Sequence, residues 1–321
     1  MYHFETFLKG PGRNAVEMAN NAKDFITAKG DKPFFLYFAT TDPHRGGGKD
    51  KTSTRELKPD LFGNLPRKGG HKGVEEVFFD PAKVPIPPFL PDTPETREEL
   101  AHYYQSCSRI DQGLGRLVAI LKEAGIYDKT LIVFTADHGM AFSGGKTTVY
   151  EGGLRVPFVV RNPYEAKRGI ESQAMISHID ITPSLLDFVG GLDEENSPKK
   201  WVNPKDFWKG KAHVARENRS GGHTFRNYHG KSWVPILGKP DGEHWQAQYR
   251  KSMSAPYGTK TVGQYIQRPK FELYDIANDP NESKNLAGDP ESAELLTEYQ
   301  DKLKAFQKRM DDPWIMKWDY E

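Results

Sequence analysis

The amino-acid sequence predicts an α/β fold up to about residue 190, in which helices pack against a mostly parallel sheet. Apolar runs at 34–39, 131–135 and 156–160 have the length and composition of buried strands. Segments of helical periodicity alternate with these runs along the chain. With 321 residues, the chain has room for two domains, or for one domain and an extension.

The first predicted element is an amphipathic helix over residues 14–29, with Gly30 as its stop. Pro33 then opens the run 34–39, which we expect to be a buried strand. Residues 45–92 are rich in Gly, Lys and Pro and are predicted to form a long loop. Loops of that length in a compact domain are usually functional or poorly ordered.

The clearest helix is expected between Thr93 and Gly125. Thr93 can accept hydrogen bonds from the free amides of the first turn, and Pro94 suits the first helical position. Gly125 is a typical residue for ending a helix. The apolar run 131–135 follows almost at once and is expected to be the next strand.

The remaining elements are a glycine-rich loop at 139–153, the third strand, and a helix at about 181–189. Further on, 271–274 is expected to be a short strand and 291–310 a final amphipathic helix. We therefore expect one α/β domain over residues 1–190 and a smaller α+β region over residues 191–321.

Composition excludes several classes of protein. There are 45 Lys and Arg against 44 Asp and Glu, a net charge of +1, so no global field favours nucleic acid or a membrane surface. No apolar run approaches the ~20 residues of a membrane span. Cys107 is the only cysteine and lies in the helical pattern, so we expect a packed thiol and no disulfide. These features leave the oligomeric state and the compartment open.

Two metal-ligand side chains, Asp137 and His138, follow the run 131–135. In open α/β sheets, ligands bind beyond the carboxyl ends of the strands. A carboxylate is a natural ligand for a hard divalent cation, and an imidazole can complete the shell. From the residues alone, a turn capped by Asp137 with His138 on the surface is an equal alternative.

Two further side chains can interact with an anion. Lys146 follows two glycines and precedes two threonines, a setting that can hold an oxyanion. It is not a P-loop, because Met140 stands where the first glycine is required. His44 follows an Asp-Pro pair and can bind an anion or act as an acid. A solvated loop and a surface histidine are the simpler alternatives for these two.

Four segments together resemble the sulfatase family, which shares the alkaline-phosphatase-like fold. In order, they are 34–44, ending in Asp-Pro-His; 134–139, Phe-Thr-Ala-Asp-His-Gly; 145–157, Gly-Lys-Thr-Thr-Val-Tyr-Glu-Gly-Gly-Leu-Arg-Val-Pro; and 177–187, beginning Ser-His-Ile-Asp. The resemblance implies a three-layer α/β/α domain, incomplete at its N-terminal end, with a smaller C-terminal α+β region.

Other segments are similar to the sulfamidase branch of that family, the heparan N-sulfatases, which remove N-sulfate from glucosamine. These segments are 42–45, 84–93, 109–113, 271–275 and 312–314. The likeness covers most of the chain and is weakest over 191–228. It implies a hydrolase acting on a sulfated saccharide, through N-sulfate or O-sulfate.

The resemblance also implies roles for single residues. Asp137 and His138 match the family's second pair of metal ligands, normally for Ca²⁺, although sulfamidases often carry Asn at the position of His138. Lys146 matches the cation that binds the sulfate oxygens, where sulfamidases can have Arg. His44 matches the histidine that contacts the sulfo group and protonates the leaving group. A metal ion, a lysine and an imidazole aimed at one point would stabilise the charge that develops on the sulfo oxygens.

Other family features do not occur in these 321 residues. The nucleophile motif, Cys/Ser-x-Pro-Ser-Arg, whose first residue becomes formylglycine, is absent, as is the first metal pair, Asp-Asp. An internal deletion is also expected near residue 245, where Trp245 joins Gln246. The chain is thus similar to a C-terminal fragment of a sulfatase, and we expect it to have little or no sulfatase activity alone.

Two alternatives stay open on the sequence. One is a non-catalytic remnant that binds sulfated glycans, and the other is a related metal-dependent phosphodiesterase or phosphatase. Family members are usually periplasmic, secreted or lysosomal, but this chain supplies no export signal of its own.

Overall fold

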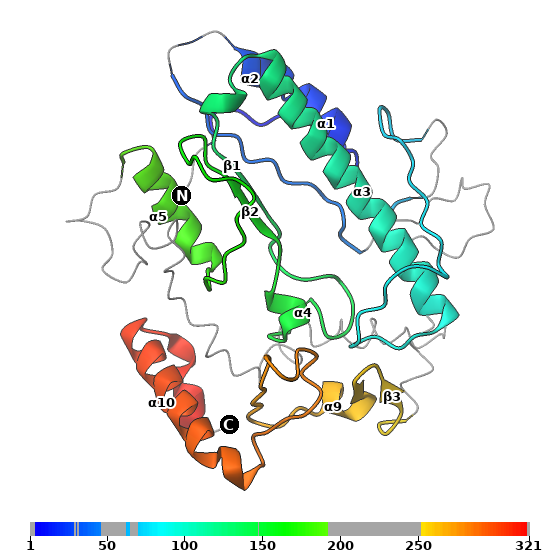
Figure 1. Ribbon diagram of the computed structural model, residues 1–321, viewed down its shortest axis with the longest axis vertical. Helices are drawn as coiled ribbons and strands as arrows, with labels where there is room; N and C mark the ends of the chain where they lie inside the picture. Colours follow the sequence, from blue (N-terminus) through cyan, green and yellow to red (C-terminus); the bar gives the residue numbers. More distant parts are fainter. Residues whose placement is uncertain are drawn as a thin grey trace.

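The computed structural model describes residues 4–28, 30, 32–45, 62–64, 70–146, 148–191 and 252–319. The deletion predicted near residue 245 lies outside these ranges, as does almost all of segment 191–245. The described elements form an α/β arrangement in which a long helix, α3, runs along one side of a central hairpin (Figure 1).

Helix α3, Pro94–Glu123, confirms the predicted caps. The Thr93 hydroxyl accepts a hydrogen bond from the amide of Thr96 at 3.2 Å, and Pro94 occupies the first turn. Gly125 has a φ of +69°, a left-handed conformation that suits glycine and ends the helix. The short 3-10 helix η1, Tyr127–Lys129, then leads to the first strand.

The single helix predicted over 14–29 is instead two consecutive helices, α1 (Ala15–Asn21) and α2 (Lys23–Thr27). Asn14 caps α1 by accepting from the amide of Glu17 at 3.0 Å. Both helices pack on the C-terminal half of α3 around a small aliphatic cluster, which we call the helical core. Its buried members are Ala19, Ala22, Ile26, Ile120 and Leu121.

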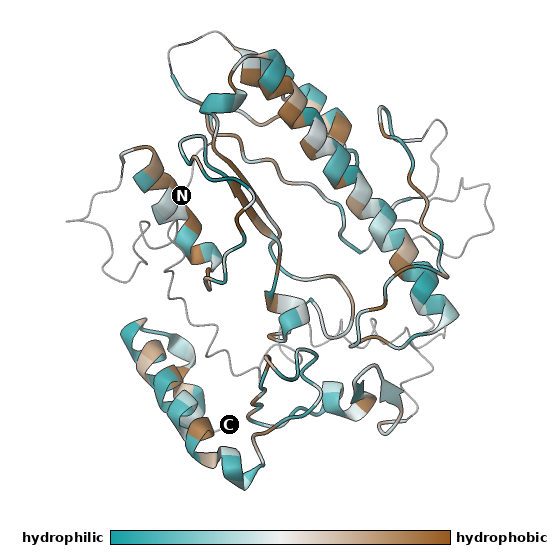
Figure 2. Ribbon diagram, viewed as in Figure 1, coloured by the Kyte–Doolittle hydropathy of each residue, from teal (hydrophilic) through white to brown (hydrophobic). Residues whose placement is uncertain are grey.

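The central strands are antiparallel, and the prediction of a mostly parallel sheet is therefore wrong for them. Strand β1, Ile132–Thr135, pairs antiparallel with β2, Phe158–Arg161, and Val133 lies opposite Val160. Parallel pairing needs a crossover that carries the chain back to the start of the first strand, usually through a long helix. The connection here contains one helical turn, α4 (Glu151–Leu154), and returns the chain directly alongside β1. Both strands are apolar (Figure 2), but they are only partly buried.

The expected buried strand over 34–39 is wrong. In the described part of the chain, this segment has no strand pairing, and Phe35 and Tyr37 are 61% and 70% exposed. Leu36 and Phe38 pack against the helical core. Side chains of an extended chain alternate between two faces, and here one face meets α3 while the other meets solvent. The apolar composition therefore did not imply burial on both sides.

The segments after β2 are mostly helical. They comprise η2 (His178–Asp180), α5 (Ile181–Phe188), α9 (Val262–Ile266), η6 (Pro290–Ser292), α10 (Ala293–Arg309) and η7 (Pro313–Asp319). Helices α5 and α10 confirm the two predicted helices. Strand β3, Pro256–Tyr257, pairs antiparallel with β4, Lys260–Thr261, in a small hairpin. The expected strand at 271–274 is wrong, because the amide of Leu273 donates to the Asn285 side chain instead of a neighbouring strand.

A second cluster, which we call the aromatic core, joins distant parts of the chain. Tyr257, Val262 and Tyr265 pack there with residues from the N-terminal half. Those partners include Phe62, Leu100, Phe142 and Tyr150. The C-terminal segment is therefore built onto the loop after β1, whereas the domain boundary near residue 190 stays a prediction. Among the described helices, none has the length and apolar character needed to cross a bilayer.

Candidate functional site

The loop that follows β1, residues 136–155, carries three of the four predicted site residues and closes on itself. The amide of Gly139 donates to the Gly153 carbonyl at 2.9 Å, and the amide of Lys146 donates to the Met140 carbonyl at 2.7 Å. A Cβ at position 139 would stand 1.8 Å from the carbonyl oxygen of Gly152, so this approach requires glycine. The backbone at Lys146 is thus fixed by contacts within the loop.

Asp137 and His138 lie at the start of this loop, as predicted. The His138 Nδ1–H donates to the Gly139 carbonyl at 2.9 Å, which leaves Nε2 3.3 Å from Asp137 Oδ2. The Asp137 side chain is 85% exposed. With a neutral imidazole, both facing atoms are hydrogen-bond acceptors and would repel unless a proton or a cation lies between them. The pair therefore has the chemistry of two metal ligands.

This pair does not make a complete calcium site. Ca²⁺ takes about 6–8 oxygen ligands in proteins. Within the described ranges, no cluster of three or more His, Cys, Asp or Glu side chains could hold a metal ion. The residues present in the described ranges thus supply at most part of a calcium shell.

His44, the fourth predicted residue, comes from the separate segment 40–45. Its backbone is fixed, since its amide donates to the Thr41 carbonyl at 2.8 Å and its carbonyl accepts from Arg13 Nη2 at 3.0 Å. Burial lowers the pKa of the His44 imidazole, and the charges of Lys146, Arg13 and His138 lower it further, while Asp137 acts in the opposite direction. The pKa of His44 thus responds to the charges of the other three predicted residues.

A buried carboxylate, Asp42, holds the segment of His44 from behind. Its two oxygens receive Arg13 Nη1 at 2.9 Å and Arg109 Nε at 2.7 Å. Arg109 is fully buried in α3 and also donates to the Phe62 carbonyl at 2.8 Å. Sequence reasoning gave no role to these ion pairs. A partial signal is the register of Gln105, Arg109 and Gly113, which places an arginine on the buried face of the helix.

Two other side chains complete the surroundings. His178, on η2, donates from Nε2 to the Ala136 carbonyl at 2.8 Å and so ties η2 to the end of β1. His178 belongs to the segment 177–187 that resembles the sulfatase family, but the sequence predicted no contact for it. Cys107 is partly buried, and burial raises the pKa of its thiol to about 11, which keeps it protonated at neutral pH. The expectation of a packed thiol is therefore confirmed.

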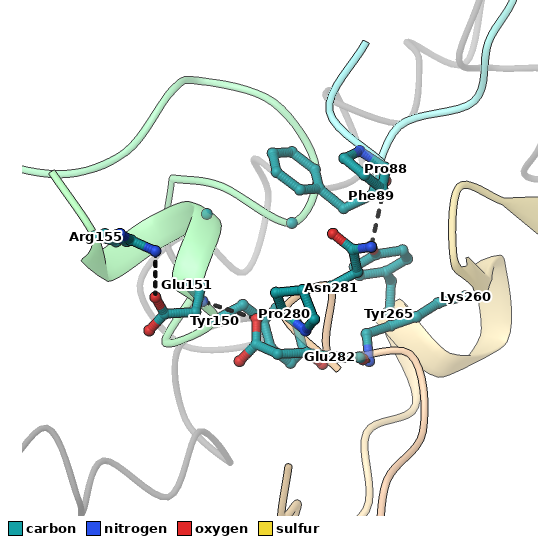
Figure 3. A pocket seen from close by; sticks show the side chains of 12 residues that line it. Pro88, Phe89, Tyr150, Glu151, Arg155, Lys260, Tyr265, Pro280, Asn281 and Glu282 are labelled. Atoms are coloured by element: carbon teal, nitrogen blue, oxygen red, sulfur yellow. Dashed lines mark hydrogen bonds and ion pairs between the residues drawn. The ribbon is translucent and has the colours of Figure 1, made fainter. Parts of the chain in front are cut away.

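A cavity of about 200 Å³ lies beside the loop, between it and the C-terminal segment (Figure 3). None of the four predicted site residues lines it, and Gly144 is the nearest lining residue to Lys146 in sequence. The lining residues are Pro88, Phe89, Gly144, Tyr150, Glu151, Gly152, Arg155, Lys260, Tyr265, Pro280, Asn281 and Glu282. The polar members come from both sides of the cavity, and sequence reasoning did not single out those at 260–282.

Comparison with known proteins agrees with this architecture. Residues 3–191 match the family model described as Sulfatase, so the chain belongs to the sulfatase family. It is 30% identical to human N-sulphoglucosamine sulphohydrolase over 95% of this chain and 66% of the human protein. It is 25% identical to an ulvan-active sulfatase of Formosa agariphila over 88% of this chain and 51% of that protein.

Solved structures show the same fold at lower identity. A sulfatase structure from work on glycosaminoglycan metabolism by Bacteroides thetaiotaomicron superposes with a TM-score of 0.59 at 19% identity, covering 94% of this chain and 60% of that one. The phosphonate monoester hydrolase of Agrobacterium radiobacter gives 0.54 at 20% identity, covering 92% and 60%. The predicted alkaline-phosphatase-like α/β fold is confirmed. The chain spans about half to two thirds of the length of the relatives it matches.

Proposed function

We propose that this chain forms the sulfo-binding part of a hydrolase that removes N-sulfate or O-sulfate from a sulfated sugar, such as a heparan-type glycan. The observation that carries the proposal is the closed loop that holds Lys146 next to the segment of the Asp137–His138 pair, and the pKa of His44 responds to the charges of all three. These residues come from separate places in the chain, and their side chains are the types that bind an anion. The names of relatives, which include N-sulphoglucosamine sulphohydrolase and N-acetylglucosamine-6-O-sulfatase, support a sulfated sugar as the ligand.

The chemistry assigns a task to each side chain. Attack at sulfur by an oxygen nucleophile, which the family's formylglycine would supply and these 321 residues do not contain, forms a new S–O bond. The S–N or S–O bond to the sugar breaks, which leaves negative charge on the sulfo oxygens and on the departing atom. The ammonium of Lys146 stabilises the sulfo oxygens, and the imidazolium of His44 can deliver the proton that the departing atom takes. Sulfatases generally use a divalent cation; we propose Ca²⁺, with Asp137 and His138 as two of its ligands, which would supply further positive charge.

The lowered pKa of His44 gives this proposal a pH dependence. At neutral pH the imidazole is mostly neutral, because its pKa lies below the ordinary 6.5. Acidification protonates it beside Lys146 and adds a positive charge where the sulfo group binds. We therefore expect sulfate binding to strengthen as the pH falls below 6.5, and His44→Gln to remove this increase.

Binding, not turnover, is what we expect of these 321 residues, because they contain no Cys/Ser-x-Pro-Ser-Arg motif. The test is calorimetric titration with N-sulfoglucosamine and with unsulfated glucosamine, in the presence of Ca²⁺. Lys146→Ala should weaken binding of the sulfated sugar by about tenfold or more, as expected for loss of a charged hydrogen bond. The matched control is Lys129→Ala, an exposed lysine just before β1, which should change nothing.

Three results would count against the proposal. Equal affinity for both sugars would show that the chain does not recognise the sulfo group. Equal weakening by both lysine variants would mean a diffuse charge effect. Stronger competition by inorganic phosphate than by sulfate would favour the related phosphodiesterase or phosphatase. Release of sulfate in the same samples would confirm the substrate class and contradict the expected inactivity.

A further inference from the structure

The final turn of the loop, around α4, is held by a carboxylate from the far end of the chain. Glu282 Oε2 accepts a hydrogen bond from the backbone amide of Glu151 at 2.8 Å, across 131 positions of sequence (Figure 3). Glu282 is 9% exposed and has a φ of +51°, a left-handed conformation that is uncommon for a residue other than glycine. Such a backbone persists only where the surrounding contacts fix it.

A second contact holds the neighbouring residue, Tyr150. Its hydroxyl donates to the two carboxylate oxygens of Glu272 at 2.9 and 3.2 Å. The Lys260 ammonium lies 4.8 Å from the centre of the Tyr150 ring and donates to the main-chain carbonyl of Glu282. Lys260 also donates to the Tyr274 hydroxyl at 2.8 Å. The C-terminal segment thus contacts both the backbone and the side chain at the start of α4.

These contacts are coupled to Lys146 through the closed loop. The amide of Gly153 donates to the Tyr150 carbonyl at 2.8 Å, and the Gly153 carbonyl accepts from Gly139. Lys146 is bonded to Met140, one residue after Gly139, by its own amide. A displacement of residues 150–153 would therefore move both the backbone of Lys146 and the end of the loop that carries Asp137 and His138.

We propose that Glu282 is a positioning residue for Lys146, acting by capping the Glu151 amide and so fixing loop 139–153. The inference rests on the anion-binding role proposed for Lys146, but the fixing of the loop can be measured without it. Glu282 itself does not contact the sulfo group. Its part is to hold the backbone from which Lys146 projects.

Several charged groups act on the Glu282 carboxyl from the elements packed around it. Glu151 and Glu272, which are themselves paired with Arg155 and Arg268, oppose its ionisation, and Lys260 favours it. Burial is the largest influence and raises the pKa of Glu282 to about 7. The Glu151 amide can donate to the neutral or the ionised carboxyl, so glutamine is a suitable conservative replacement, whereas alanine removes the acceptor.

The test compares Glu282→Ala and Glu282→Gln with the wild-type chain by amide hydrogen exchange resolved to loop 139–153. The alanine variant should raise exchange at Lys146 and Gly139 by about tenfold, the effect of losing one buried hydrogen bond, without changing α3. The glutamine variant should restore the slow exchange. Glu298→Gln, which alters an exposed ion pair with Lys302 on α10, is the matched control and should exchange as the wild type does.

A second readout separates positioning from general stability. In the wild type, the amide resonance of Glu151 should titrate with a midpoint near pH 7, and Glu282→Gln should remove this transition. Binding of inorganic sulfate should weaken several-fold in Glu282→Ala and should recover in Glu282→Gln. The upper limit is about tenfold, which corresponds to the free energy of one hydrogen bond.

Faster exchange at Glu151 alone, with Lys146 unchanged, would overturn the proposal. It would show that Glu282 caps only the Glu151 amide and does not fix the backbone of Lys146. So would a loosened loop with unchanged sulfate affinity. If the wild type binds no sulfate, the proposed function fails, and exchange at Lys146 decides the role of Glu282 by itself. If the alanine variant does not fold, the pH titration of Glu282→Gln decides, and a Glu151 amide transition near pH 7 that persists in this variant would also overturn the inference.

Discussion

Two buried carboxylates stand behind the candidate site, and they hold it in different ways. Asp42, behind His44, is shared between Arg13 and Arg109, with nitrogen–oxygen distances of 2.9 and 2.7 Å. Glu282, behind Lys146, receives a backbone amide, while the nearby Lys260 donates to its main-chain carbonyl and not to its carboxylate. One support is an ion-pair network, and the other is essentially a hydrogen bond.

The difference predicts how each support fails. Removing Asp42 leaves buried guanidinium groups without their counter-charge, which costs much more than the loss of one contact. Removing the charge of Glu282 leaves a group that can still accept the Glu151 amide, so the support should survive protonation. The region behind His44 should therefore depend on charge, and the region behind Lys146 should depend on the presence of an acceptor.

The largest expected effect is at Asp42. Asp42→Ala should lower the free energy of unfolding by about 3–5 kcal/mol, because both arginines lose a buried partner. Asp92→Ala is the matched control, since Asp92 pairs with Arg97 at the surface, where solvent screens the ion pair, and its loss should be much smaller. Urea denaturation of the two variants measures the contrast. Similar losses for both would remove the distinction that we draw between the two supports.

The next effect concerns the contact between α1 and α3, which sets the spacing of Arg13 and Arg109. A Cβ at Gly113 would lie 2.3 Å from the Cβ of Ala15, so Gly113→Ala should cost about 1–3 kcal/mol through overpacking. Gly115→Ala meets no atom within 4 Å and should stabilise α3 by up to about 1 kcal/mol. Thermal denaturation of both variants tests this. A stability change of the same sign in both would contradict the close packing of α1 on α3 at Gly113.

A smaller effect is the pH dependence of Glu282. Its pKa is raised from 4.5 to about 7 on folding, so the folded chain binds more protons than the unfolded chain between these values. The stability associated with this group is fully present below pH 4.5 and is lost as the pH rises through about 7. Allowing for partial screening by solvent, the change is on the order of 2 kcal/mol.

The measurement is the difference between the stability–pH curves of the wild type and Glu282→Gln. Subtracting one curve from the other removes the contribution of His44, which is common to both proteins. Its lowered pKa makes stability rise with pH just below pH 6.5, the opposite of the effect of Glu282. The wild type should lose stability relative to the variant between pH 4.5 and about 7. A difference that stays flat across this range would show that the Glu282 carboxyl titrates as it does in the unfolded chain.

The smallest effect is expected at Tyr150. Tyr150→Phe removes the hydrogen bond to Glu272, but that carboxylate keeps Arg268 and Tyr274 as partners. The expected cost is about 1 kcal/mol, the usual net value of one hydrogen bond. Chemical denaturation gives the cost. A loss as large as that of Asp42→Ala would mean that the region behind Lys146 is also an indivisible charge network.

Helix α3 and strand β1 illustrate what could be predicted from sequence. The α3 helix, its Thr93 cap and its end at Gly125 depend on residues that are close in the chain, and all three predictions are confirmed. The position of β1 is confirmed for the same reason, since an apolar run between turns is a local pattern. The motifs around Asp137 and Lys146 indicated the sulfatase family for similar reasons, although the roles of those residues remain proposals.

The predictions that failed depended on which segments become neighbours. Segment 34–39 and strands β1 and β2 were expected to lie buried in a parallel sheet, but apolar composition does not specify a partner or a direction of pairing. The pairings that make the two supports of the site could not be predicted either, although the register of α3 places Arg109 on its buried face. Asp42 and Arg109 are 67 positions apart, and Glu151 and Glu282 are 131 apart.

The sequence by itself determined the helices α3, α5 and α10, the ends of α3, the strand before Asp137 and the candidate anion-binding residues, because these features follow from local spacing and side-chain chemistry. The tertiary structure decided the antiparallel hairpin, the exposure of Phe35 and Tyr37, and the contacts that close the loop around Lys146. The physical reason is that burial and electrostatic pairing act between atoms within a few ångströms of each other, and chain folding brings together residues that are distant in sequence.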